Sequence, residues 1–497
     1  MKKSFLKLNI LIVLATLITV VCVAYFGGCV SQGKMGDNTY AHYTNLAEGQ
    51  NIKLTGLEGQ ASHQIIDLGE VKSFNTITLK ESGKSVMQFN IYASNEAEES
   101  SFKLIYEGDT IEDFRVCYIS DVSYRYLKVE VARSTGTFKV NDIKVYNNTD
   151  SKATQRVCSY FILDRVVPET APEGASEEEI EAHKERYDHQ FDALATVTDL
   201  IIFGMTDFDI EGNVIISNPE LFDNNIALLK NAVQKVQDEQ GRHINMLVDI
   251  FMPERHKDDP NAGARTMMSS ESATLNAAKS INALLDKYSL DGVDFDYEYP
   301  YSHTEKKLYN NFLVSIKANL TKNKLLSTAV GAWNLDYSKE ALEAVDLLQL
   351  MTYDMFDSHG YHAAFNSCVM RDVNTLLNKG VAKEKIVLGL PFYSRPLNKS
   401  GYWGDYATFY NGGYIQNKFT NVVYSFHTTE MSGVEINDAQ YLNGVQMIAD
   451  KTAFSIDAHL AGVMIWHYHC DIEYDNDMSL FRAINSTINA KGATLAK

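Results

Sequence analysis

Residues 153–492 alternate short apolar runs with stretches of helical periodicity. The apolar runs are rich in Val, Ile, Leu and Phe, which is typical of strands buried in a parallel sheet. Between them, segments such as 225–237 and 272–287 repeat their apolar residues at the period of a helix. This alternation predicts an α/β domain whose parallel sheet closes as a (β/α)8 TIM barrel. The predicted strands are 156–163, 198–208, 243–252, 290–300, 325–333, 345–355, 385–395 and 461–471.

The fourth of these runs, residues 290–300, differs from the others because every second side chain is acidic. Asp294, Asp296 and Glu298 alternate there with apolar or aromatic residues. In a strand, side chains at i, i+2 and i+4 project from one face, about 6.6–6.8 Å apart per pair. The three carboxyls should therefore form a ladder that retains at least one proton at neutral pH, because neighbouring carboxylates repel. Active residues of such barrels lie at strand carboxyl ends, which is where Glu298 falls.

Two other interpretations of this acidic ladder are less favoured. A solvated edge strand would not carry large apolar groups on its opposite face. Three carboxylates can hold a hard cation, but calcium loops have a glycine in mid-loop, whereas Gly292 precedes all three carboxyls. We therefore predict a site that uses no metal and no cofactor.

The segment Asp291–Glu298 resembles the D-G-x-D-x-D-x-E signature of glycoside hydrolase family 18, the chitinases and endo-β-N-acetylglucosaminidases. Other strand ends extend the resemblance. Met351-Thr352-Tyr353-Asp354 resembles the M-x-Y-D of the sixth strand, and 388–393 with Arg395 resembles the seventh. Residues 462–466, which end in Trp466, resemble the eighth strand, and Tyr160 stands where the first often places an aromatic residue.

The resemblance implies retaining, substrate-assisted cleavage of a β-1,4 bond that follows an N-acetylglucosamine unit. Glu298 would protonate the glycosidic oxygen. Asp296 would hold the acetamido N–H and offset the oxazolinium charge, while Asp294 shares a proton with it. Tyr353 would orient the acetamido group, and Trp466 would form an apolar floor under the sugar. The other substrate-binding residues that the resemblance implies are Tyr160, Met351, Asp354 and Arg395.

The sequence does not decide the natural glycan. Residues 244–251 lack the S-x-G-G pattern common in the third strand of the family, and Tyr297 stands where chitinases usually have Trp. Chitin or chitooligosaccharides, the chitobiose core of N-glycans and peptidoglycan all present the required sugar. A non-catalytic lectin or a scaffold protein is the alternative to an enzyme, although Glu298 is present. The aromatic loop 397–426 should either line the cleft or pack on itself.

Residues 40–148 predict a separate module, because short alternating runs separated by turns are typical of a β-sandwich. Segments 45–47, 66–69, 91–95 and 125–127 resemble the discoidin-like, factor five/eight type C family, which overlaps carbohydrate-binding module family 32. The resemblance implies a jelly roll. The stretch between the first two motifs, which usually carries the ligand loop and a calcium site, is short and has no Trp. Sugar binding and a packing or spacer role both remain open.

Residues 1–29 predict export. Lysines near the N-terminus precede an apolar run at 10–26, and Gly27-Gly28-Cys29 resembles a bacterial lipoprotein processing site that would lipidate Cys29. A retained membrane anchor is the alternative. We expect an exported, cell-surface or membrane-anchored protein whose partners are a membrane and an N-acetylglucosamine-containing glycan. The formal charge of −19 argues against a nucleic acid partner.

Four cysteines follow Cys29 and show no close metal-ligand spacing: Cys117, Cys158, Cys368 and Cys470. Cys158 and Cys470 belong to neighbouring predicted strands, so a disulfide between them is one interpretation. Buried free thiols are favoured because cysteine is so often a core residue.

Overall fold

The computed structural model describes residues 36–50, 52–253, 258–397, 404–428 and 435–497. The predicted export segment 1–29, with Cys29, lies outside the described residues, as do Tyr402 and Trp403 of the aromatic loop. Among the helices that the structure describes, none has the length and apolar character needed to cross a membrane.

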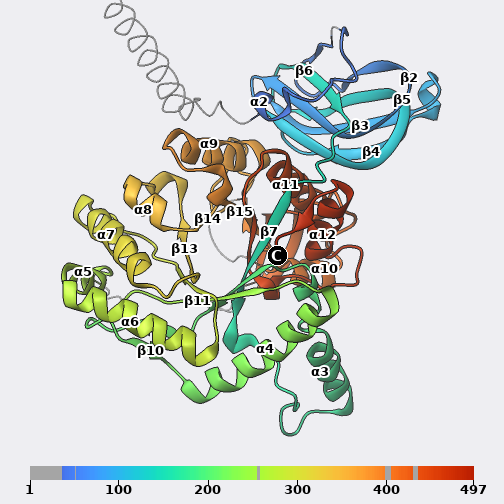
Figure 1. Ribbon diagram of the computed structural model, residues 1–497. Helices are drawn as coiled ribbons and strands as arrows, with labels where there is room; N and C mark the ends of the chain where they lie inside the picture. The colour runs from blue at the N-terminus through green and yellow to red at the C-terminus, as the bar shows by residue number, and fades with distance from the viewer. Residues whose placement is uncertain (1–35, 51, 254–257, 398–403, 429–434) are drawn as a thin grey trace, which may run out of the picture.

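The predicted barrel is confirmed (Figure 1). Its strands pair in parallel, and the sheet closes because Gly462 to Ile465 pair with Arg156 to Ser159. A short last strand, β20 (Thr494–Leu495), adds to the first. In order around the barrel the strands are β7 (Thr154–Ile162), β8 (Asp199–Phe203), β11 (Asn245–Asp249), β12 (Gly292–Phe295), β13 (Leu325–Val330), β14 (Leu347–Leu350), β15 (Ile386–Pro391) and β19 (Gly462–Trp466).

Most of the strands are shorter than the apolar runs that predicted them. β12 ends at Phe295 and β14 ends at Leu350, so the residues that follow form the rim of the barrel. Beyond the last ladder hydrogen bond the backbone is free to turn toward the barrel axis. The alternation of apolar and polar residues continues into this rim, because successive side chains still point in turn to the core and to the barrel mouth.

Helices cover the outside of the barrel (Figure 1). The predicted helical segments 225–237 and 272–287 lie within two of them, α4 and α6. The first begins at Pro219, whose preceding Asn218 side chain accepts from Leu221 N–H, and ends before Gly241 in the left-handed conformation. The helices are α3 (Glu177–His189), α4 (Pro219–Gln240), α5 (Ala262–Ser269), α6 (Glu271–Tyr288), α7 (His303–Asn319), α8 (Lys339–Ala344), α9 (Arg371–Asn378), α10 (Tyr406–Asn411), α11 (Val445–Asp457) and α12 (Leu480–Ala490).

An inserted hairpin follows β15. Its strands β17 (Val422–Thr428) and β18 (Glu435–Tyr441) pair antiparallel, and the short β16 (Arg395–Pro396) pairs with the second of them. This three-stranded sheet leaves the barrel mouth at Arg395 and runs toward the N-terminal module.

The N-terminal module is a six-stranded antiparallel sheet in the order β1-β6-β2-β5-β3-β4, which has an apolar core of its own. Strands β2 and β5, of 21 and 20 residues, are longer than the short alternating runs suggest, because register shifts after Asp67 and Phe74 interrupt the alternation without ending the ladder. The module is sheet-rich, as expected, and its membership of the discoidin-like family stays a prediction. The strands are β1 (Leu54–Gly56), β2 (Ser62–Ser82), β3 (Val86–Ser94), β4 (Lys103–Gly108), β5 (Arg115–Ser134) and β6 (Phe138–Tyr146).

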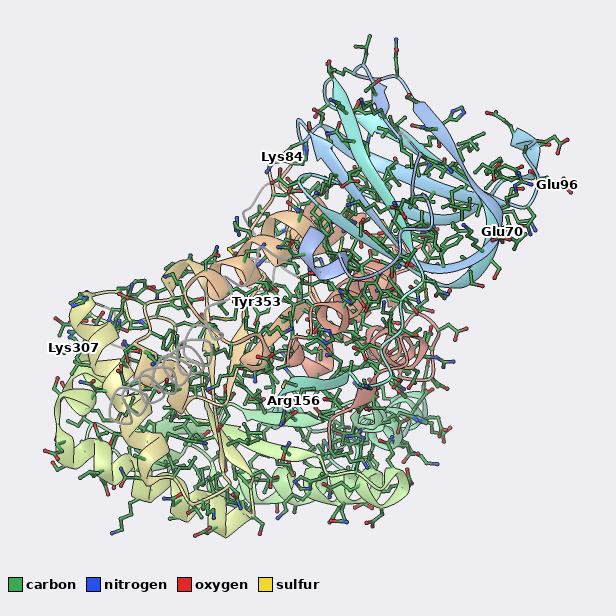
Figure 2. The ribbon with its side chains drawn as sticks, turned by 45° about the horizontal axis from the view of Figure 1, so that its top comes forward. Glu70, Lys84, Glu96, Arg156, Lys307 and Tyr353 are labelled. Carbon is green, nitrogen blue, oxygen red and sulfur yellow. The ribbon has the colours of Figure 1, made fainter. Side chains whose placement is uncertain are left out.

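The sheet docks on one side of the barrel, beside α9 and α11, through buried polar contacts (Figures 1 and 2). Arg115 Nη2 lies 3.1 Å from Asp450 Oδ2, and Tyr106 donates to the same oxygen at 2.6 Å. At a second point Tyr40 of the N-terminal module donates to Asp457 Oδ2 at 3.0 Å, and the other oxygen of this buried carboxyl lies 2.8 Å from Lys491 Nζ of the barrel domain. Docking removes water from these charged groups, so each of them needs its partner in the protein. The partners meet in one orientation of the module, and this orientation is therefore favoured.

Candidate active site

A cavity of about 310 Å³ opens at the carboxyl ends of the barrel strands. All of the predicted catalytic and substrate-binding residues line it except Asp294, which lies beneath it. Figure 2 shows Tyr353 in the barrel part of the molecule, away from the N-terminal sheet. The lining is Tyr160, Phe203, Phe251, Asp296, Glu298, Ala329, Met351, Tyr353, Asp354, Tyr393, Arg395 and Trp466.

The acidic ladder runs from the barrel interior to solvent. Asp294 is fully buried, Asp296 is half-buried and Glu298 is exposed. The alternate residues face outward, where Phe295 contacts Phe312 with ring centroids 5.3 Å apart. The exposure of the carboxyls therefore increases along the ladder: Asp294 is shielded from water, and Glu298 can be reached by a bound ligand.

Hydrogen bonds hold the buried end of the ladder. Tyr160 donates its hydroxyl to Asp294 Oδ2 at 2.9 Å, and the Ser327 hydroxyl donates to Oδ1. Burial raises the pKa of Asp294, and these two hydroxyl donors oppose the rise only in part. Asp294 is thus a carboxyl that retains a proton more readily than one in water.

Asp249, at the end of β11, is a fourth acid, fully buried, that the sequence analysis did not select. Its Oδ1 accepts the Asp296 backbone N–H at 2.9 Å. Its Oδ2 is buried and has no hydrogen-bond partner within the part of the chain that the structure describes. Burial and the neighbouring Asp294 and Asp296 raise the pKa of Asp249 well above its usual range. Four carboxyls therefore share this region, and burial raises the pKa of the two innermost ones.

Glu298 lies at the outer end of the ladder, beside Tyr299. The tyrosine hydroxyl donates to Glu298 Oε1 at 3.1 Å. Burial and the Glu298 charge raise the Tyr299 pKa, which keeps this donor protonated. The Tyr299 ring meets Trp333 edge to face at 4.7 Å, so the hydroxyl has a fixed position against the carboxyl.

Asp354 is held at the cavity wall by three side chains. Arg395 Nε and the Tyr393 hydroxyl each donate to Asp354 Oδ1 at 2.7 Å, and its backbone N–H donates to His362 Nε2 at 2.9 Å. Burial acts to raise the pKa of Asp354, but its partners hold it well below its usual range. Its φ of 59° lies in the left-handed region, which aspartate tolerates better than most residues. Asp354 is therefore a charged anchor for Arg395 rather than a proton donor.

Aromatic rings form the rest of the cavity wall. Trp466 meets Tyr160 at 5.3 Å and Phe203 at 4.9 Å, in edge contacts that brace the indole from two sides. Tyr353 is buried, and the hydrogen bond described for its hydroxyl is a long one to the Met464 sulfur at 3.8 Å. Because a thioether is a weak acceptor, this phenol is available to a ligand.

Several lining residues were missed by the sequence analysis although a signal for them exists. The lining residues Phe203 and Phe251, and the acid Asp249 beneath the cavity, stand at or just after the ends of the second and third barrel strands. The rule that selected Glu298 would have selected them too. In the aromatic loop 397–426, by contrast, none of the described aromatic residues lines the cavity. Tyr406 and Phe409 instead pack into the barrel core.

The described thiols Cys117, Cys158 and Cys470 are free and buried, which confirms the thiol interpretation and excludes the Cys158–Cys470 disulfide. The Cys368 side chain lies outside what the structure describes.

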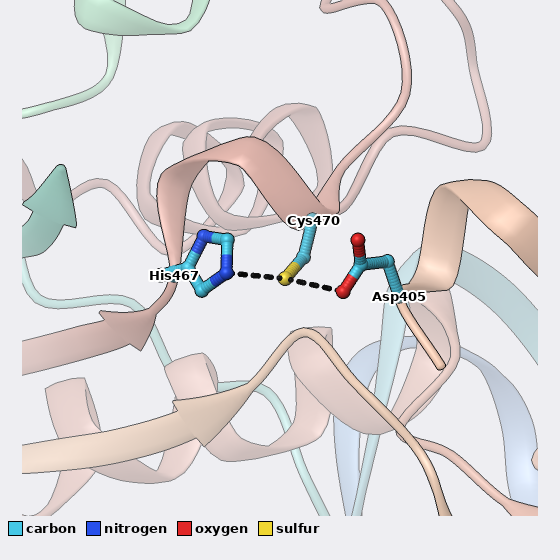
Figure 3. Close-up of side chains that lie close together, drawn as sticks. All are labelled: Asp405, His467 and Cys470. Atoms are coloured by element: carbon cyan, nitrogen blue, oxygen red, sulfur yellow. Dashed lines mark hydrogen bonds between the residues drawn. The ribbon is translucent and has the colours of Figure 1, made fainter. Parts of the chain in front are cut away.

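Cys470 belongs to a cluster next to the cavity wall, where its Sγ lies 3.2 Å from Asp405 Oδ1 and 3.3 Å from His467 Nε2 (Figure 3). These residue types can bind zinc, and their ligand atoms gather within 4.8 Å. However, Arg165 Nη1 lies 3.4 Å from the same His467 nitrogen, and a guanidinium there opposes a cation. Hydrogen bonds among the three residues account for the cluster, which joins the loop after β15 to the loop after β19.

Residues 257–471 match the family model described as Glycosyl hydrolases family 18. The barrel carries the sequence pattern of that family. Among curated proteins, "Probable chitinase 2" of Drosophila melanogaster is 26% identical over 242 residues, or 39% of this chain and 50% of that protein. "Chitinase A1" of Niallia circulans is 27% identical over 262 residues, or 39% of this chain and 36% of that protein. The match thus spans half or less of the length of these two relatives.

Solved structures share the fold of this barrel. A chitinase from Bacteroides thetaiotaomicron is 20% identical, with a TM-score of 0.51, over 68% of this chain and 98% of that one. The Group IV chitinase of Ostrinia furnacalis, solved with allosamidin, is 19% identical, with a TM-score of 0.51, over 68% of this chain and 100% of that one.

Proposed function

We propose that the protein is a glycoside hydrolase that cleaves β-1,4-linked glycans after an N-acetylglucosamine unit, with retention and with the substrate's acetamido group as nucleophile. The observation that carries the proposal is the graded ladder, in which an exposed Glu298 and a half-buried Asp296 line one cavity with Tyr353, and a buried Asp294 lies beneath it. The family match of the barrel supports the same reaction class.

Glu298 is the proton donor in this proposal. It is the ladder carboxyl that solvent reaches, so a glycosidic oxygen bound at the cavity mouth can approach it. Departure of an alkoxide is the difficult step of the reaction, and protonation of that oxygen removes the difficulty. The same carboxylate then accepts a proton from the water that opens the intermediate.

Asp296 stabilises the positive intermediate. As the acetamido oxygen attacks the anomeric carbon, an oxazolinium ring forms and the acetamido nitrogen gains positive charge. A carboxylate beside its N–H offsets that charge. Asp294 and Asp249 lie below Asp296, and burial raises the pKa of both, so that they bind a proton more readily than a carboxyl in water. A proton held on these inner acids lets Asp296 carry the negative charge without a like charge next to it.

Tyr353 and Trp466 position the sugar. The phenol, bonded only weakly to Met464, donates to the acetamido oxygen and directs it at the anomeric carbon. The indole, braced by two aromatic edges, stacks against the apolar face of the ring.

Chitin or chitooligosaccharides are the glycans favoured in this proposal, with the N-glycan core and peptidoglycan as alternatives. A non-catalytic lectin of the same fold remains the rival outside the enzymes. Export and lipid attachment at Cys29 belong to the same proposal and rest on residues 1–29. Mass spectrometry of the N-terminal peptide from a membrane fraction tests them, because an unmodified or unprocessed Cys29 contradicts lipidation.

The nucleophile is tested with matched substrates. An N-acetylglucosamine oligomer should be cleaved, while the glucose oligomer of the same length should scarcely react, because effective molarities of roughly 10⁵ M or more vanish with the acetamido group. A substrate whose acetamido oxygen is replaced by sulfur should slow or trap the enzyme as a thiazoline. Comparable turnover of the two oligomers would show that the protein supplies the nucleophile. Binding of the N-acetylglucosamine oligomer without cleavage would favour the lectin.

A further inference from the structure

A second cleft, of about 460 Å³, lies between the N-terminal sheet and the barrel domain, and it shares no lining residue with the catalytic cavity. Strands β3, β4 and β5 supply one wall, and the segment 413–424 supplies the other. We call it the interdomain cleft. The lining residues that matter here are Gln88, Glu107, Arg133, Tyr414, Gln416 and Tyr424.

Contacts between the two domains fix the walls of the interdomain cleft. Asp109 from the sheet accepts from Asn421 Nδ2 at 3.2 Å and from the Tyr441 hydroxyl. Tyr441 stacks on Tyr361 with centroids 4.5 Å apart, and Arg133 donates to the Tyr361 hydroxyl at 3.5 Å. Because these partners are already engaged with one another, a ligand would meet a preformed surface.

The chemistry of the walls fits a neutral sugar. Tyr424 lines the cleft, yet 74% of its surface is exposed, so its ring is open to a ligand. An exposed ring beside amide, carboxyl and guanidinium groups offers stacking for the apolar face of a pyranose and partners for its hydroxyls. The charged lining groups are two carboxylates, Glu107 and Asp109, and one guanidinium, Arg133, and so small a net charge does not select a polyion.

The interdomain cleft lies close to the catalytic cavity. In the three-stranded sheet, Arg395 of the cavity is opposite Tyr441, which is opposite Val422 of the cleft. Two strand spacings separate the first and last of these backbones by roughly 10 Å. A polymer held in the cleft would therefore present its neighbouring segments to the cavity at a raised effective concentration.

We propose that the interdomain cleft binds an uncharged segment of the glycan that the barrel cleaves, with Tyr424 as its stacking platform. The inference rests on the proposed function for the identity of the sugar. Within that function it assigns the N-terminal module to substrate capture, as half of a binding site shared with the barrel.

Hydrogen exchange on the full chain tests the site. The Glu298→Gln variant is mixed with the N-acetylglucosamine hexamer, so that bound sugar is not consumed. Peptides from 413–424 and 87–109 should gain protection together with the cavity peptides. Tyr424→Ala in the same background should abolish protection at the cleft alone and weaken hexamer binding there roughly tenfold, whereas Tyr424→Phe retains it. Ile215→Ala, also at an exposed apolar side chain, should change neither region.

The outcomes separate the two proposals. Protection of the cavity without the cleft would overturn the inference and leave the proposed function intact. Equal protection of the cleft by the glucose hexamer would overturn the assignment to the cleaved glycan. Protection of the cleft without the cavity would instead refute the proposed function. With Glu298 restored, Tyr424→Ala should lower turnover of polymeric substrate several-fold and leave a short soluble substrate unaffected, and equal loss on both would also overturn the inference.

Discussion

The catalytic cavity and the interface between the sheet and the barrel both bury charged groups, but they arrange them in opposite ways. At the interface two of the buried acids meet cations: Asp450 meets Arg115, and Asp457 meets Lys491. In the cavity Asp249 and Asp294 are buried among other acids, and the nearby Arg395 is paired with Asp354 instead. An acid buried with a cation favours the one structure in which the two groups meet. An acid buried near other acids has a raised pKa and can hold a proton for a reaction.

Replacing the exposed end of the ladder should have the largest effect. Glu298→Gln keeps the shape and removes the proton donor, so turnover should fall by about 10²–10⁴-fold. Unfolding should be unchanged, because the side chain is exposed. Steady-state kinetics and thermal unfolding of the same preparation check both statements. Glu181→Gln on the solvent side of α3 is the matched control, and activity within tenfold of wild type in Glu298→Gln would end the assignment.

Breaking a buried pair should instead affect stability. Arg115→Met leaves Asp450 without its cation, so the free energy of unfolding should fall by roughly 3–5 kcal/mol. Turnover of short substrates below the unfolding temperature should stay near wild type, since the pair is outside the cavity. Urea unfolding measures the loss. Arg125→Met, which breaks a partly exposed pair with Asp67 in the same sheet, should leave stability close to wild type. Equal losses in the two variants would contradict the distinction drawn between buried and exposed pairs.

The smallest effect is expected at Asp249. Its raised pKa favours the neutral acid, and an amide has the same shape, so Asp249→Asn should keep activity within about tenfold of wild type. In the wild type, folded Asp249 binds its proton more tightly than the unfolded chain does. Stability should therefore fall as pH rises from the unfolded pKa of about 3.9 through the higher folded pKa.

The Asp249→Asn variant lacks this titration, so its stability should fall less over the same range, which urea unfolding at several pH values measures. An identical pH dependence in the two proteins would show that Asp249 is charged in the folded state. Asp249→Ala serves as a contrast, since it leaves the Asp296 N–H without its acceptor and should cost more stability than the amide does.

Sequence periodicity predicted the barrel strands, because a strand buried on both faces must be apolar wherever it lies. It was less informative for the N-terminal sheet, where bulges in β2 break the alternation while the ladder continues. The acids Asp294, Asp296 and Glu298 were found because they are close in the chain. Asp249 and Phe251 stand at and just after the carboxyl end of another strand, where the same rule could have selected them, and the pairing of β11 with β12 brings Asp249 beside the ladder.

The sequence by itself determined the alternation of strands and helices and the order of three acids on one face, since both follow from local periodicity. Only the tertiary structure decided how deeply each acid is buried, which acid pairs with Arg395, and that the two domains share a cleft. Burial and charge pairing depend on residues that are hundreds of positions apart in the chain, as Asp450 and Arg115 are. A local sequence pattern does not show that such residues meet.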